Sequence, residues 1–362
     1  MTSLLCLVMG AAGCVPSLDG AERVLVYDYE DGSLVPLERE LRIAAEDLVA
    51  GRSAETEIII GGELGLTGPR LSMHGGRAPN LPASVQDGLL VPDDADALAF
   101  FSFLVHLQTA GDWYVDRGMA DRRLFEGLQS RYEVFFPFTT EWRSLADNAG
   151  YFPPTHDFLL GPSERVPGAP VMASPGVVGH ELGHAVQVST GDADSLRTEC
   201  LGRDDRASCR TITAMDEGLS DLWAVGIWGD SDFVRRNFGD LAGDRDLGEL
   251  KAMDEALFDL ADASRDADSV DVSDWDPHGP GAIWASWWWA VGDQLGDMDR
   301  AIELSWDLAF AVGQLRAQDV FGVVEMSALF LGSATAAERA QACPVFRSVM
   351  PADVFAQVLP CT

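Results

Sequence analysis

His180 and His184, four residues apart with Glu181 directly after the first, are the residues of this chain best suited to chemistry. On an α-helix, positions i and i+4 share a face, so both imidazoles can bind one metal ion. Glu181 then lies beside the ion without being a ligand, where it can accept a proton from water. The pattern H-E-x-x-H therefore predicts a hydrolytic zinc site. A chance match is the alternative, and the surrounding sequence has to distinguish the two.

The sequence around this motif predicts a buried helix. Ser174 followed by Pro175 is a favourable helix start, because serine caps free N–H groups and proline lacks one. Gly191 is a suitable helix end. Between them, apolar residues occupy nearly every side of the helix: Val177, Val178, Leu182, Ala185 and Val186. A solvated helix would carry an apolar residue on one face only, so we expect this helix to be buried.

A catalytic zinc ion needs a third protein ligand and one open position. The stretch 213–224 offers Glu217 and Asp221, which share a helical face at a spacing of four. We expect Glu217 to bind the metal and Asp221 to hydrogen-bond a ligand histidine and fix its tautomer. A solvated acidic face is the alternative, but the apolar neighbours Leu219 and Leu222 favour burial of at least one side.

H-E-x-x-H followed by E-G-x-S-D resembles the gluzincin metallopeptidases of the thermolysin and fungalysin branches, and MDEGLSDLWA is particularly similar to the fungalysin version. A third match is HGPGAIWA, in which His278 resembles the histidine that stabilises the transition state. Asn148 and Ala149 stand where the family has an Asn-Ala on a strand that binds the substrate backbone. The blocks cover about residues 95–300. The resemblance implies one zinc ion per chain, Glu181 as general base, and a peptide or protein substrate.

Two departures from the family pattern matter. The separation between His184 and Glu217 is longer than in thermolysin-like enzymes, and it contains Cys200 and Cys209. The position four residues before the first histidine is Gly176, whereas many thermolysin-like members have an acidic calcium ligand there. Calcium binding is therefore left open. Asp274 and Asp276 are both near enough in sequence to orient His278, and spacing alone does not choose between them.

Composition limits the classes of partner. The 362-residue chain has 25 basic and 58 acidic residues, a formal net charge of −33. Such a surface would repel nucleic acid, which binds basic proteins. No segment approaches the roughly 20 apolar residues that span a bilayer. Charge and composition leave the oligomeric state open.

The N-terminus and the cysteines predict export. An apolar run from Leu4 to Gly13 precedes Cys14, and the sequence Ala-Ala-Gly-Cys resembles a bacterial lipobox whose cysteine is lipidated. A buried N-terminal strand is the alternative. The four cysteines outside this segment form two local pairs, Cys200/Cys209 and Cys343/Cys361, which predict disulfides in an oxidising compartment. Buried thiols are the alternative. We expect a lipoprotein of the bacterial cell envelope or a secreted protein.

These observations predict an α+β, zincin-like metallopeptidase of two lobes, with the H-E-x-x-H helix at the centre and a mainly helical C-terminal lobe. Residues 1–13 would be the signal peptide, 14–94 a β-rich segment with a helical stretch near 37–50, and 95–362 the catalytic region. A helix is expected from 95 to about 118, in which His106 is a core residue. The predicted function is zinc-dependent endopeptidase. One alternative is a surface-anchored protein that keeps the zinc but binds rather than cleaves. A second alternative is a different metal-dependent hydrolase with a similar site.

Overall fold

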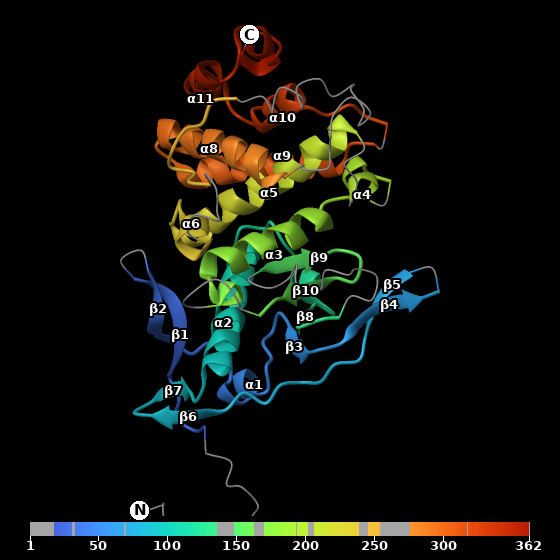
Figure 1. The fold of residues 1–362 in the computed structure, drawn as a ribbon. Coiled ribbons are helices and arrows are strands. Elements are labelled where there is room, and N and C mark those ends of the chain that lie inside the picture. Colours follow the sequence, from blue (N-terminus) through green and yellow to red (C-terminus); the bar gives the residue numbers. More distant parts are fainter. Residues whose placement is uncertain are drawn as a thin grey trace, which may run out of the picture.

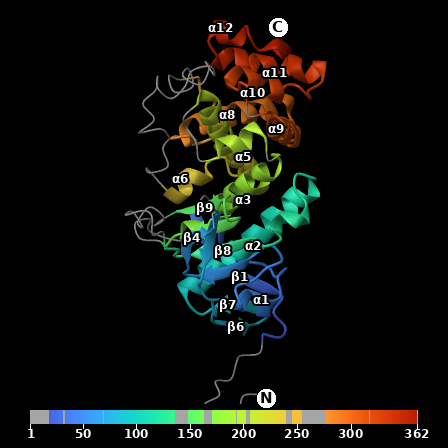
Figure 2. The same cartoon turned by 90° about the vertical axis from the view of Figure 1, so that its right-hand side faces the viewer.

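Strands and one long helix form the N-terminal half of the fold, and helices form the C-terminal half (Figure 1). The structure is a computed structural model that describes residues 18–30, 33–68, 70–135, 148–162, 170–192, 194–201, 206–238, 245–253, 276–316 and 318–361. Helix α3 (Pro175–Ser189) lies between the two halves in both views (Figures 1 and 2). The expected α+β class is therefore confirmed.

The first sheet has the strand order β2-β1-β7-β6. Its strands are β1 (Arg23–Glu30), β2 (Ser33–Glu40), β6 (Ala83–Gln86) and β7 (Leu89–Pro92). The β6–β7 hairpin turns at Asp87 and Gly88, whose φ angles are 50° and 77°. Positive φ at both central residues is the geometry for which Asp-Gly is favoured in a two-residue hairpin turn.

The prediction of a helix near residues 37–50 is wrong for the first part of this range. Residues up to Glu40 belong to β2, and α1 covers only Ala45–Val49. β2 pairs with β1 along its whole length, with Leu37 opposite Val26. The ladder of backbone hydrogen bonds and the packing of β1 on the core outweigh the helical propensity of Leu-Glu-Arg-Glu.

The second sheet lies beneath α3 and has the order β3-β8-β10-β9. Its strands are β3 (Glu57–Ile60), β8 (Gln129–Tyr132), β9 (Ala149–Phe152) and β10 (Asp157–Leu160), and a separate hairpin contains β4 (Glu63–Thr67) and β5 (Arg70–His74). β3, β8 and β10 are parallel, whereas β9 is antiparallel to β10 and forms the edge next to α3.

Helix α2 (Ala95–Asp116) packs on β1 and β7 of the first sheet and on α3, and its Phe100 and Phe103 contact rings of β8 and β10 in the second sheet. It matches the helix expected from 95. The side chain of Asp94 caps it by accepting a hydrogen bond from the N–H of Ala97 at 2.8 Å. His106 is buried, and its Nε2 donates to the carbonyl of Tyr27 at 2.6 Å. It is thus a hydrogen-bonded core histidine, as expected.

The C-terminal half is a stack of helices in which α5 packs on α3 and α8 packs on α5 (Figure 2). Its further helices are α4 (Leu196–Cys200), α5 (Ala207–Trp228), α6 (Phe233–Phe238), α8 (His278–Leu295), α9 (Met298–Gly313), α10 (Val323–Phe330), α11 (Ala336–Val349) and α12 (Ala352–Phe355). Trp284, Trp287 and Trp288 of α8 are fully buried. The tryptophan cluster of this helix therefore belongs mainly to the core.

Three glycines within the recognised motifs allow these helices to approach closely. A Cβ on Gly183 of α3 would lie 2.8 Å from Oγ of Ser220 in α5, and one on Gly218 would lie 2.5 Å from the carbonyl oxygen of Gly281 in α8. Real Cβ atoms do not approach other atoms this closely, so a larger residue would force the helices apart. The glycines therefore set the spacing at which side chains of α3, α5 and α8 meet.

Candidate metal centre and active site

Helix α3 presents His180 and His184 on one face. The Oγ of Ser174 caps its first turn by accepting from the N–H of Val177, and Pro175 occupies the first position, as expected. His180 is almost completely buried. The i, i+4 spacing places the two imidazoles with their ring centroids 4.8 Å apart. One face of this helix is thus directed at α5.

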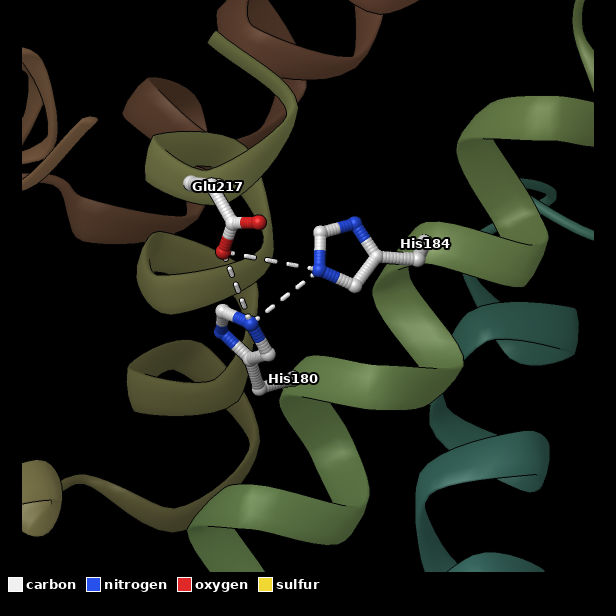
Figure 3. A group of neighbouring side chains, drawn as sticks. All are labelled: His180, His184 and Glu217. Atoms are coloured by element: carbon white, nitrogen blue, oxygen red, sulfur yellow. Dashed lines mark hydrogen bonds and ion pairs between the residues drawn. The ribbon is translucent and has the colours of Figure 1, made fainter. Parts of the chain in front are cut away.

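Glu217 of α5 meets the two histidines (Figure 3). Nε2 of His180 lies 3.1 Å from Nε2 of His184, and Oε2 of Glu217 lies 3.2 Å from the first and 3.6 Å from the second. Ligand atoms bonded at roughly 2.0–2.1 Å around a tetrahedral ion are about 3.3–3.4 Å apart. The spacing of the three atoms therefore fits one metal ion, and the group can hold one.

The hydrogen bonding of the three groups also fits a cation. Oε2 of Glu217 is buried and forms no hydrogen bond within the described residues. Burial by itself raises the pKa of Glu217, but the imidazoles of His184 and His278 outweigh it and hold this pKa well below its usual value. The positive charge of protonated imidazoles balances the carboxylate in this way. When His180 and His184 are neutral, their Nε2 lone pairs converge on the same buried carboxylate, and this arrangement is costly unless a cation lies among them.

Asp221 fixes the orientation of His180. Its Oδ1 accepts a hydrogen bond from Nδ1 of His180 at 2.7 Å, so Nε2 is left to bind a metal. Burial lowers the pKa of His180, but the Asp221 carboxylate outweighs it and raises this pKa to about 10. Arg245 donates to both oxygens of Asp221, at 2.6 and 3.2 Å. The buried carboxylate thus bridges a histidine and an arginine.

Arg245 was not identifiable from the sequence, because it lies outside every motif and in a stretch without regular structure. Ser220 was also missed, although it belongs to E-G-x-S-D. Its Oγ lies 3.3 Å from Nδ1 of His184 and accepts a hydrogen bond from the side-chain amide of Gln187 at 2.9 Å. The serine of the motif is the feature that could have predicted this contact.

Glu181 lies beside the metal group, which consists of His180, His184 and Glu217, and the edge strand β9 positions its side chain. Its Oε1 is 4.0 Å from Nε2 of His180, and its Oε2 accepts a hydrogen bond from the N–H of Tyr151 at 2.9 Å. One oxygen is thus engaged by the sheet and the other faces the centre. No motif in the sequence predicted the contact between Glu181 and Tyr151.

Asn148 and Ala149 lie at the start of the same strand. Asn148 is exposed, and its Oδ1 accepts a hydrogen bond from the N–H of Ala149 at 2.9 Å. Ala149 is buried opposite Leu160 of β10. Ala149 is therefore the first residue of the edge strand that reaches Glu181, and Asn148 directly precedes it. An extended peptide could add to the sheet at this edge.

His278 is the first residue of α8 and points at Glu217. Its Nε2 lies 3.2 Å from Oε2 of Glu217, and its Nδ1 donates to Oδ1 of Asp276 at 2.6 Å. Asp276 therefore orients this imidazole, while Asp274 lies outside the described residues. The side chain of His278 is 41% exposed, against 7% for His180, so it borders the solvent side of the centre.

Gly176 leaves no space for the acidic residue found there in many thermolysin-like enzymes. A Cβ at this position would lie 2.3 Å from Cδ2 of Phe233 in α6. Phe233 therefore occupies the space that a carboxylate would need, and α3 packs directly on α6 here.

Both expected disulfides are present. Cys200 and Cys209 join the end of α4 to the first turn of α5, with Cα atoms 4.9 Å apart. Cys343 of α11 is bonded to Cys361, with Cα atoms 5.5 Å apart. The predicted signal segment and Cys14 lie outside the described residues. Among the described helices, none is long and apolar enough to cross a membrane.

No protein-family model matches this chain, and no curated protein matches it. The assignment of function therefore rests on the motifs and on the geometry of the site.

Proposed function

We propose that this protein is a zinc-dependent endopeptidase of the gluzincin type, with a zincin-like fold. The observation that carries the proposal is the convergence of the His180, His184 and Glu217 ligand atoms within 3.1–3.6 Å, with Glu181 beside them. Two imidazoles and one carboxylate are the ligand set of catalytic zinc sites that keep one position open. Zinc bound there would polarise the scissile carbonyl and bring the pKa of its water toward neutrality.

The chain's own residues would carry the proton and orient the substrate. Glu181 takes the proton of the attacking water and passes it to the leaving amine, while the N–H of Tyr151 holds its other oxygen in place. His278 donates a hydrogen bond to the carbonyl oxygen as negative charge develops there, with Asp276 fixing its ring. The edge strand β9, beginning at Ala149, would align the peptide backbone.

The alternative is a pseudo-peptidase that binds zinc and a partner without cleavage. The position of Glu181 argues for turnover, because a protein without turnover has no need for a carboxylate held 4.0 Å from a ligand nitrogen by a backbone N–H. We therefore prefer peptide hydrolysis to binding without cleavage as the proposed function.

Elemental analysis combined with proteolysis of casein tests the proposal. We expect about one zinc ion per chain, cleavage of casein, and loss of cleavage in a chelator with recovery on adding zinc. Glu217→Ala should lose both metal and activity, whereas Glu249→Ala, an exposed acidic control, should lose neither. Absence of bound metal in the wild type, or cleavage that a chelator does not affect, would contradict the proposal.

We further propose that the protein is exported and anchored by a lipid at Cys14. The two disulfides support an oxidising compartment. Cys14→Ser should release the protein into the soluble fraction or block its processing. A wild-type protein that is soluble and begins at Met1 would rule out the anchor.

A further inference from the structure

A cavity of about 200 Å³ lies beside the metal group, and both polar and apolar side chains line it. His184 and Glu217 form part of its wall, so the cavity is continuous with the proposed active site. Arg197 and Asp216 are among its other polar lining residues. Its volume is several times the roughly 30 Å³ that one water molecule occupies in the liquid, so it has room for a substrate side chain.

Arg197 of α4 brings hydrogen-bond donors without acceptors to this cavity. Only 1% of its side chain is exposed. Its Nε, Nη1 and Nη2 are buried and form no hydrogen bond with any residue that the structure describes. Its charge is paired with Asp216, whose Oδ1 lies 3.2 Å from Nη2. Buried N–H groups that lack acceptors cost free energy, so this arrangement favours an acceptor that arrives through the cavity.

Asp216 of α5 supplies an acceptor next to these donors. Its Oδ1 is buried and accepts no hydrogen bond within the described part of the chain. Its backbone carbonyl accepts one from the side-chain amide of Gln187 at 2.8 Å, which links this turn of α5 to α3. A donor group and an acceptor group without hydrogen-bond partners therefore lie side by side in the wall of the cavity.

The segment between the H-E-x-x-H helix and α5 supplies Arg197, and it is the segment whose length departs from thermolysin-like enzymes. Both ends of α4 are held. Oγ of Ser195 caps its first turn by accepting a hydrogen bond from the N–H of Thr198 at 3.2 Å. The disulfide between Cys200 and Cys209 joins its other end to α5. The guanidinium is thus carried by a helix that is fixed in place at the cavity.

We propose that this cavity is a subsite for a glutamine or asparagine side chain next to the cleaved bond, and that Arg197 and Asp216 determine this preference. The proposal rests on the proposed peptidase function. The carbonyl oxygen of a carboxamide can accept from the guanidinium, and its nitrogen can donate to the carboxylate. A substrate carboxylate would lie against Asp216, and a substrate ammonium would lie against Arg197, so each would meet a like charge. An apolar side chain would leave both groups without partners.

Cleavage of matched peptides tests the proposal. Gln, Glu and Met have side chains of similar length, and each is placed in turn on either side of the scissile bond. We expect kcat/KM for Gln at one of these positions to exceed that for Glu and for Met by about 10- to 100-fold, because the carboxamide satisfies both groups. A wild-type enzyme that cleaves these peptides but prefers Glu or Met to Gln, or does not distinguish the three, would overturn the proposal.

Asp216→Asn tests the role of the carboxylate with almost no change in shape. Arg197 then has no opposite charge beside it, so the preference should move from Gln to Glu. Arg197→Lys keeps the positive charge but lacks the planar fork of donors, and it should lower the ratio of Gln to Met severalfold. A change from one preferred substrate to another is an outcome that a misfolded variant cannot produce.

Asp157→Asn is the matched control, because Asp157 forms a buried ion pair with Arg131 at the same distance of 3.2 Å and does not line the cavity. Its ratios between the three substrates should equal those of the wild type. Chelator-sensitive cleavage by Asp216→Asn with an unchanged preference for Gln would overturn the proposal and leave the peptidase function intact. Failure of the wild type to cleave any peptide would contradict the peptidase function and the subsite with it.

Discussion

The carboxylate of Asp221 accepts a hydrogen bond from Nδ1 of His180 at 2.7 Å, and both groups are buried. This contact selects the tautomer of His180 whose Nε2 faces His184 and Glu217. Arg245 binds the same carboxylate from the other side and keeps it ionised, since burial raises the pKa of Asp221 but Arg245 and His180 outweigh it and lower this pKa. The orientation of His180 thus depends on a chain of three residues in which His180 and Asp221 are buried and Arg245 is 15% exposed.

Replacing Asp221 by Asn should therefore weaken zinc binding by about 10- to 100-fold, the usual cost of losing such a partner of a ligand histidine. Competition with a chromophoric chelator measures the affinity. Asp299→Asn is the control, because the Asp299 side chain is 73% exposed and forms its ion pair with Arg117, which belongs to none of the motifs. Equal zinc affinity in both variants would show that Asp221 does not orient the ligand.

Glu181→Gln should retain zinc and lose peptide hydrolysis. The amide oxygen can still accept the hydrogen bond from Tyr151, but the amide cannot accept a proton at neutral pH. Zinc content and casein cleavage are measured on the same preparation. Near-normal activity of this variant would show that Glu181 is not the general base.

His278→Ala should lower kcat by about 10²–10³, the range for loss of one donor to a developing oxyanion. Asp276→Asn should have a smaller effect, because it removes only the group that orients the imidazole. Steady-state kinetics with one peptide compare the two variants. A larger loss for Asp276→Asn than for His278→Ala would reverse the assigned roles.

Removal of either disulfide should destabilise the fold by about 3 kcal/mol, since each closes a short loop in the unfolded chain. Denaturant unfolding of the Cys→Ser pairs measures this change. Free thiols at these positions in exported protein would contradict both bonds.

Local patterns predicted the parts of the site that lie on single helices. The spacing of His180 and His184 determines a shared face, because helical periodicity is a property of the backbone and not of its surroundings. Glu217 and Asp221 follow from the same rule on α5. The cap of α3 was likewise predicted, since a cap depends on a side chain a few residues from the groups it satisfies.

Contacts between distant segments were not predictable in this way. The pairing of β2 with β1 replaced part of an expected helix, because sheet partners depend on neighbours and not on the propensity of the strand itself. The bond from Tyr151 to Glu181 and the choice of Asp276 over Asp274 depend on how a strand and a loop end meet α3 and α8.

From the sequence alone, the ligand types, their spacing on each helix, the local cysteine pairs and the acidic surface were determined, because each depends on residues close together in the chain or on composition. Tertiary structure decided which helices meet, through glycine contacts such as Gly218 against Gly281. It also placed Arg245 on Asp221 and the N–H of Tyr151 on Glu181. Those positions result from packing the whole core, in which every element restricts where its neighbours can lie.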